Sequence, residues 1–160
     1  MVSTLGIFDN AKVSDLLRFD GPHGTFFFRS KQERRIIFLA TGTGIAPIKG
    51  MLEQFEQNPI LIKDKTIEIY WGNRTFDEFY WKPQFEAIEI NFNLILSRKN
   101  SDWQGMFGYV QDAVLLNNSN LHDSVVYASG SPAMIDSAKS LFARKGLKED
   151  CFFSDAFYSS

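Results

Sequence analysis

The stretch that decides the fold class runs from Arg35 to Pro47 and reads RIIFLATGTGIAP. Its first part, Arg35–Ala40, is a short apolar run ending in a glycine-containing loop, which is typical of a strand buried on both faces. The next segment, Ile48–Gln57, carries apolar residues at spacings of three and four, which predicts a helix. A strand, a tight turn and a helix in this order form the repeating unit of α/β folds.

The same alternation continues to the end of the chain. Further apolar segments predict strands at Thr66–Trp71, Phe92–Ser97, Ser124–Ser129 and Cys151–Ser154. Amphipathic segments predict helices at Phe76–Ile88, Tyr109–Leu116 and Pro132–Lys145. Because alternating strands and helices build parallel sheets covered on both faces, we predict an α/β fold with a doubly wound five-stranded parallel sheet and helices on both faces.

Residues 1–33 have a different pattern. Two short stretches, Leu16–Phe19 and Thr25–Phe28, are separated by the turn-forming segment Asp20–Gly24. This pattern predicts a β-hairpin or the tail of a β-unit, too short to have a core of its own. We therefore expect residues 1–33 and 34–160 to belong to two different domains.

Composition excludes several classes of function. The 160 residues include 17 Lys and Arg against 19 Asp and Glu, so no broad positive field favours nucleic acid or an anionic membrane. The single cysteine, Cys151, excludes an internal disulfide and a four-thiolate metal site, and His23 and His122 belong to no ligand cluster. No apolar run reaches about 18 residues and no signal peptide opens the chain, so we predict no membrane span and a cytoplasmic location.

The loop Thr41–Pro47 lies where an α/β sheet places its ligand, between a strand and the following helix. Gly42 and Gly44 allow backbone N–H groups to approach an anion, so the loop is a candidate phosphate site. It matches neither complete nucleotide motif, because Pro47 occupies the third glycine position and no Gly-Lys-Ser/Thr follows. A plain tight turn without a ligand is the alternative interpretation.

Five blocks in a fixed order carry a resemblance to a known family: Gly21–Phe26, Thr41–Pro47, Tyr70–Arg74 with Phe79–Trp81, Trp103–Val110 and Tyr127–Met134. With them the chain resembles the ferredoxin–NADP reductase superfamily, specifically its C-terminal pyridine-nucleotide domain as found in bacterial flavin reductases, oxygenase reductases and CDP-6-deoxyglucoseen-reductase-like proteins. The resemblance implies an NAD(P)H-binding domain of a flavin-dependent oxidoreductase, which delivers hydride from nicotinamide to FAD for onward electron transfer.

The resemblance also implies roles for particular residues. The pyrophosphate and the nicotinamide ribose would lie on the first loop: Thr41, Gly42, Thr43, Gly44, Ile45 and Pro47. The phosphates or the adenosine ribose would lie near the end of the second strand, at Gly72, Asn73 and Arg74. In relatives that use NADPH, the 2′-phosphate contacts the positions of Ser97 and Arg98, where a guanidinium suits a dianion. The nicotinamide itself would lie against the turn of Gly130, Ser131, Pro132 and Met134, with Thr43, Ser129 and Phe157 as the catalytic residues around its reacting carbon.

Two departures from the family pattern affect the expectation. Ser129-Gly130 stands where many relatives have Cys-Gly, and the Arg-x-Tyr-Ser motif that binds flavin is absent. We therefore interpret residues 1–33 as the C-terminal edge of a truncated FAD-binding β-barrel and expect this chain to bind NADH or NADPH but to retain little FAD. The implied partners are the missing FAD-binding domain and an electron acceptor, which could be a sugar-nucleotide dehydrase, an oxygenase, ferredoxin or free flavin.

Two further hypotheses follow from the sequence. Aromatic residues at Phe26–Phe28, Phe152, Phe153 and Phe157 would face the missing domain, so self-association of the chain is expected. The alternative function is a flavodoxin-like or regulatory nucleotide-binding module without reductase activity, in which the first loop would bind the phosphate of FMN.

Overall fold

A computed structural model describes residues 12, 14–16, 24–29, 31–98 and 103–156. Its sheet has six strands, all parallel, in the order β4-β3-β2-β1-β5-β6. The strands are β1 (Arg35–Thr41), β2 (Thr66–Asn73), β3 (Asn91–Leu96), β4 (Met106–Phe107), β5 (Ser124–Gly130) and β6 (Phe152–Ala156). The five strands predicted between Arg35 and Ser154 are all present, and β4 is an addition that is too short to show a periodic pattern.

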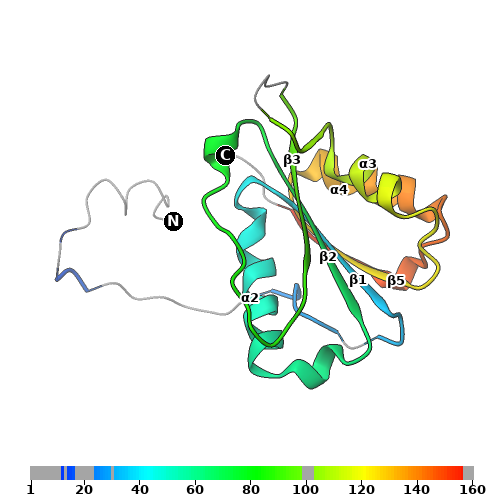
Figure 1. Cartoon of the computed structure of the whole chain (residues 1–160), viewed down its shortest axis with the longest axis horizontal. Coiled ribbons are helices and arrows are strands. Elements are labelled where there is room, and N and C mark those ends of the chain that lie inside the picture. The colour runs from blue at the N-terminus through cyan, green and yellow to red at the C-terminus, as the bar shows by residue number, and fades with distance from the viewer. Residues whose placement is uncertain (1–11, 13, 17–23, 30, 99–102, 157–160) are drawn as a thin grey trace.

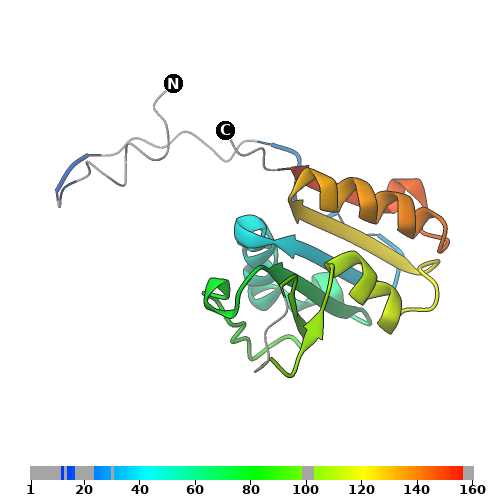
Figure 2. The same ribbon diagram turned by 90° about the horizontal axis from the view of Figure 1, so that it is seen from above.

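Helices cover both faces of this sheet, which confirms the doubly wound fold (Figures 1 and 2). The α-helices are α2 (Ile45–Gln57), α3 (Val110–Asn117) and α4 (Pro132–Ala143). Helix α2 packs on one face against β1 and β5, whereas α3 and α4 pack on the other. Short 3₁₀ turns complete the chain: η1 (Gly42–Gly44), η2 (Pro59–Ile62), η3 (Phe76–Glu78) and η4 (Glu149–Cys151).

The core lies around the two central strands. Residues Ile36–Ala40 of β1 are fully buried, and every residue of β5 is buried. Continuous apolar runs are needed here because helices cover both faces. The register aligns Ala40 with Trp71 of β2 and with Ser129 of β5, so the carboxyl ends of these three strands meet at one edge of the sheet.

The helix predicted for Phe76–Ile88 is wrong. Only the single turn η3 forms, and the chain then runs without regular structure to β3. The rings of Phe79, Tyr80 and Trp81, three consecutive residues, all lie within 6.5 Å of the Trp71 ring between centroids. Consecutive helical residues point in directions about 100° apart, so a helix could not place all three rings there. Pro83 further disfavours a helix interior because it lacks a backbone N–H.

The segment before β1 is also different from the prediction. In the described residues 24–29 no strand forms, although Thr25–Phe28 was expected as one; Leu16 is described and is not in a strand, and residues 17–23 lie outside the described residues. Phe28 instead packs edge-on against Phe55 at 4.7 Å between ring centroids. The Tyr127 hydroxyl accepts a hydrogen bond from the Arg29 N–H at 2.9 Å. Residues 24–29 therefore pack, through Phe26 and Phe28, against the core of the parallel sheet, and the division into two domains at residue 33 stays a prediction.

Among the described residues, no helix is long and apolar enough to cross a membrane. Groups of three or more His, Cys, Asp or Glu side chains arranged for a metal ion are likewise absent from this part of the chain.

Candidate functional site

A large cleft opens at the carboxyl ends of the strands. It has a volume of about 990 Å³. The residues that line it come from the ends of the strands, the loops that follow them and helices α3 and α4: Thr41, Gly42, Thr43, Gly72, Asn73, Arg74, Glu78, Tyr80, Ser97, Gly108, Tyr109, Val110, Gln111, Gly130, Ser131, Ala133, Met134 and Ser137. This is the edge where open parallel sheets bind ligands.

Most residues predicted from the sequence meet in this cleft. Those that line it are Thr41, Gly42, Thr43, Gly72, Asn73, Arg74, Ser97, Gly130, Ser131 and Met134. Those that are described but do not line it are Gly44, Ile45, Pro47, Arg98, Ser129 and Pro132. Phe157 lies outside the described residues. The predicted group is therefore brought together by the fold, although several of its members support the cleft wall from behind.

The glycines of the first loop have different physical roles. A Cβ at Gly44 would collide with the backbone of Ser129, so this glycine permits close packing of the loop on β5. Gly42 has open space around it, but its φ of +54° is a left-handed conformation that favours glycine. Close packing on β5 therefore explains why residue 44 is a glycine, without any ligand. That Gly42 lets the backbone approach a phosphate stays a prediction.

Hydrogen bonds fasten the first loop on two sides. The Thr41 Oγ1 accepts a hydrogen bond from the backbone N–H of Ser131 at 2.9 Å, which joins the loop to the start of α4. The Trp71 Nε1–H donates to the Gly42 carbonyl at 2.9 Å, which joins the loop to β2. One wall of the cleft is thus held from both neighbouring strands before any ligand binds.

A second loop follows β2 and is organised by Glu78. Its carboxylate accepts hydrogen bonds from the backbone N–H groups of Arg74 at 2.8 Å and Thr75 at 3.4 Å. The Asn73 side chain, only 6% exposed, donates to the Glu78 carbonyl at 3.3 Å. The Arg74 side chain is exposed at the cleft and forms no ion pair with a described residue. This loop therefore presents one positive group beside one carboxylate.

Gln111 is a site residue that the sequence analysis missed. It is 6% exposed, and its Nε2 donates to the Ser137 Oγ at 3.3 Å. Its Oε1 is buried and has no hydrogen-bond partner among the described residues. An unpaired buried acceptor costs about 1–3 kcal/mol, and rotation of the Gln111 side chain toward the cleft would let its Oε1 accept a hydrogen bond from a ligand. The available signal was a glutamine within the apolar start of the predicted helix Tyr109–Leu116.

Two tyrosines that were not predicted as site residues also line the cleft. Tyr80 is 62% exposed and Tyr109 is 65% exposed, and both line the cleft. The Tyr80 ring is held edge-on against Trp71 at 5.3 Å between centroids. Partial burial raises the pKa of Tyr80, so its hydroxyl stays protonated at neutral pH. Exposed aromatic rings of this kind offer flat surfaces to a planar ligand group.

The lining residues contain neither His nor Cys, and their charged members are Arg74 and Glu78. Groups that exchange protons near pH 7 are thus not part of the described cleft wall. The arrangement suits binding and orienting a ligand better than proton transfer by the chain itself.

Comparison with known families agrees with this geometry. The family model described as the oxidoreductase NAD-binding domain matches residues 38–140, which includes the second half of β1 from Phe38, the first loop, both tyrosines and β5. The chain belongs to this family.

Two curated relatives of this chain are reductases. A CDP-6-deoxy-L-threo-D-glycero-4-hexulose-3-dehydrase reductase from Yersinia pestis is 41% identical over 158 residues, covering 96% of this chain and 47% of the relative. An NAD(P)H-flavin reductase from Aliivibrio fischeri is 31% identical over 144 residues, covering 86% of this chain and 59% of the relative. The chain therefore spans only about half the length of these curated relatives.

A solved structure shows the same fold. The CS-b5R domains of human Ncb5or, in the NAD⁺ form, superpose with a TM-score of 0.77 and 20% identity, covering 96% of this chain and 45% of that chain. At this identity the likeness concerns the fold alone.

Proposed function

We propose that this chain is the NAD(P)H-binding domain of a flavin-dependent oxidoreductase and that the cleft holds the nucleotide. The observation that carries the proposal is the cleft at the carboxyl ends of the strands, where a glycine turn meets the buried, unpaired acceptor of Gln111. Family membership supports the same conclusion.

The residues present fit a dinucleotide. A volume of about 990 Å³ lies at the upper end of the range of ligand pockets, as a large ligand needs. The turn Thr41–Thr43 suits the negative diphosphate, and the Arg74 guanidinium suits the 2′-phosphate of NADPH. The rings of Tyr80 and Tyr109 suit a planar base, and the Gln111 Oε1 suits an amino group that donates a hydrogen bond.

At the nicotinamide end we propose that Thr43 and Gly130 contact the ligand, because both line the cleft. The Ser129 hydroxyl is fully buried and has no partner among the described residues. A role for Ser129 and Phe157 at the nicotinamide stays a prediction. When bound, NAD(P)H supplies a hydride for FAD, which we assign mainly to a domain outside this chain. The chain's share is to hold and orient the nicotinamide.

The preference between NADH and NADPH depends on which cation meets the 2′-phosphate. Arg98 is exposed beyond the end of β3 and does not line the cleft, whereas Ser97 and Arg74 do. We therefore propose Arg74 as the stronger contributor. Separate Arg74→Ala and Arg98→Ala variants test this: the first should weaken NADPH more than NADH. Equal loss of both nucleotides in Arg74→Ala would assign Arg74 to a group that they share, and a larger NADPH effect in Arg98→Ala would return the role to Arg98.

For the electron acceptor we propose a dehydrase that acts on a nucleotide-linked hexulose. This assignment comes from the name of the Yersinia pestis relative. An oxygenase, ferredoxin or free flavin are the other outcomes of an acceptor assay on the complete protein. Self-association also stays a prediction: Phe26, Phe28, Phe152 and Phe153 pack partly against the core, while Phe27 is 54% exposed.

The proposed function is tested by titrating the chain with NADH, NADPH and FMN in calorimetry. We expect saturable binding of at least one of the two dinucleotides and little FMN binding. Tighter binding of FMN would favour the flavodoxin-like module instead. Absence of dinucleotide binding at millimolar concentration would contradict the proposal.

A further inference from the structure

Trp71 connects two parts of the cleft wall without lining the cleft itself. It is fully buried near the carboxyl end of β2. Its indole N–H nevertheless donates a hydrogen bond of 2.9 Å to the Gly42 carbonyl in the turn that follows β1. A buried indole N–H requires a partner, and here the partner is the backbone of the candidate phosphate loop.

This bond determines the direction of one peptide group. In a planar trans peptide the carbonyl of one residue and the N–H of the next point in opposite directions. Because the Gly42 carbonyl points at Trp71, the Thr43 N–H points away from Trp71. Thr43 is exposed and lines the cleft. Gly42, at φ +54°, has no side chain to restrict this peptide, so the indole bond is an important restraint on it.

The indole ring is itself held in place. Phe79 and Tyr80 pack edge-on against it, at 5.1 and 5.3 Å between ring centroids. Phe92 of β3 lies at 6.4 Å. An indole packed on several sides has little rotational freedom, so its N–H has a defined direction. The same ring also supports Tyr80, which lines the cleft.

We propose that Trp71 is a positioning residue: its indole N–H orients the Gly42–Thr43 peptide so that the Thr43 N–H faces a phosphate oxygen of the bound nucleotide. The inference rests on the proposed function. It assigns a role in binding to a side chain that touches no ligand.

The test compares Trp71→Phe with Trp81→Phe. The first removes the N–H donor and keeps an aromatic ring. The second is a matched control, because Trp81 belongs to the same aromatic cluster, 6.5 Å from Trp71 between centroids, and its indole forms no hydrogen bond to a described residue. Loss of one hydrogen bond in the supporting position should weaken ADP binding about fivefold in Trp71→Phe. Trp81→Phe should leave the dissociation constant for ADP nearly unchanged.

A second measurement separates positioning from general packing. In ¹H–¹⁵N spectra of the wild-type chain, the Thr43 amide should shift on addition of ADP, and this shift should decrease strongly in Trp71→Phe. Equal weakening of ADP by both variants, or an unchanged Thr43 response in Trp71→Phe, would overturn the inference. If the wild-type chain bound neither ADP nor NADH, the proposed function would fail first. If the wild type bound them and Trp71→Phe bound them equally well, only the role of Trp71 would fail.

Discussion

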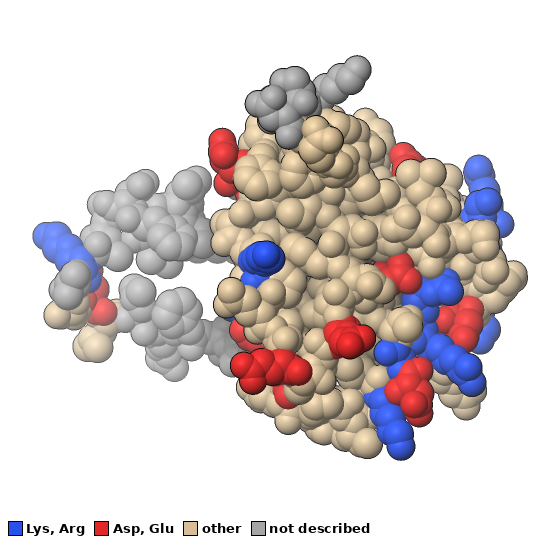
Figure 3. Space-filling view, viewed as in Figure 1, with Lys and Arg blue, Asp and Glu red and all other residues tan. Residues whose placement is uncertain are grey.

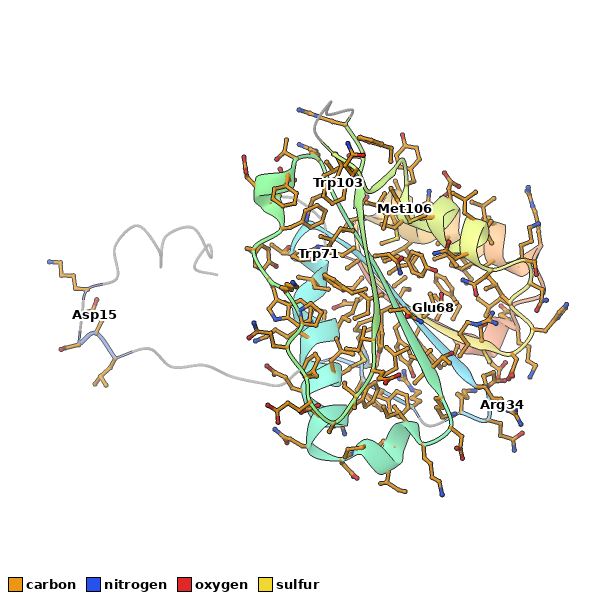
Figure 4. The ribbon with its side chains drawn as sticks, viewed as in Figure 1. Asp15, Arg34, Glu68, Trp71, Trp103 and Met106 are labelled. Carbon is orange, nitrogen blue, oxygen red and sulfur yellow. The ribbon has the colours of Figure 1, made fainter. Side chains whose placement is uncertain are left out.

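The amino and carboxyl ends of the sheet differ in whether their buried polar side chains have hydrogen-bond partners within the protein. At the amino ends of the strands, charged side chains gather on the surface (Figure 3). Arg34 and Glu68 lie toward this end of the sheet (Figure 4). At the carboxyl ends the same face is mostly uncharged, and Trp71 and Trp103 are labelled there. The difference in bonding between these ends distinguishes groups that stabilise the fold from groups that are available to a ligand.

The amino end is a closed network. The Glu68 carboxylate accepts hydrogen bonds from the Tyr70 hydroxyl at 2.7 Å and the Asn118 amide at 2.9 Å, and it pairs with the Arg35 guanidinium at 3.5 Å. Burial, together with the Glu68 carboxylate, raises the pKa of the Tyr70 hydroxyl well above its usual value, so it remains a donor. Each of these polar groups has a partner within the protein.

The carboxyl end is open. The two buried side-chain atoms without a partner in the described part of the chain are the Gln111 Oε1 and the Ser129 Oγ, and both lie at this end. Buried polar groups are normally paired, and of these two residues Gln111 lines the cleft, whereas Ser129 lies behind its wall. Under the proposed function, we therefore expect polar groups to contribute mainly to stability at the amino end and to nucleotide binding at the carboxyl end.

The largest effect is expected for Gly44→Ala. A Cβ at this position would collide with the backbone carbonyl of Ser129, which cannot move aside, so we expect a loss of about 3 kcal/mol in the free energy of unfolding. Gly50→Ala is the matched control, since a Cβ there meets open space within α2 and should stabilise by about 0.5–1 kcal/mol. Urea denaturation measures both. A Gly44→Ala chain as stable as the wild type would show that the loop can move away from β5.

Glu68→Ala tests the closed end. Tyr70, Asn118 and Arg35 would lose their shared acceptor, and we expect a loss of about 2 kcal/mol in the free energy of unfolding. The dissociation constant for NADH should stay within about twofold of the wild-type value, because none of these residues lines the cleft. A large loss of affinity with unchanged stability would contradict the division between the two ends.

Gln111→Leu is the opposite case. The substitution removes a buried acceptor that has no partner among the described residues, and it also removes the Nε2–H donor to the Ser137 Oγ, so the free energy of unfolding should fall by about 1 kcal/mol or less. Nucleotide affinity should fall about fivefold, because the ligand would lose its acceptor. Calorimetric titration with NADH, alongside denaturation of the same sample, measures the two quantities. Loss of stability without loss of affinity would make Gln111 a structural residue.

The smallest effect concerns the Cys151 thiol, at the amino end of β6. Burial raises its pKa from 9.0 to about 11, so the thiol stays protonated at pH 8. Iodoacetamide should therefore label the native chain slowly at pH 8 and label the denatured chain rapidly. Because the folded pKa is raised, the related contribution to stability is present below about pH 9 and decreases as the pH rises toward 11. Rapid labelling of the native chain would show that this end is not closed.

Much of the fold was accessible from the sequence because it depends on local patterns. The apolar runs predicted each of the longer strands, and Pro132 marked the first turn of α4. The start of α2 at Ile45, earlier than the expected Ile48, lies within the usual uncertainty of helix ends. The helix predicted at Phe76–Ile88 does not form, because the rings of three consecutive residues of this segment pack around the Trp71 ring of β2. The apolar periodicity within the segment does not encode a contact with another strand.

For the site, local chemistry by itself pointed to the glycine turn after β1, because a loop between a strand and a helix lies at the ligand-binding edge of a parallel sheet. The Gly72–Arg74 end of β2 and the Gly130–Met134 turn were expected from the family resemblance, and all three segments meet at the cleft. Only the tertiary structure decided that Gln111 and Tyr109 join them, and that Gly44 serves packing on Ser129. Those roles depend on distances between strands far apart in the chain, which no local pattern encodes.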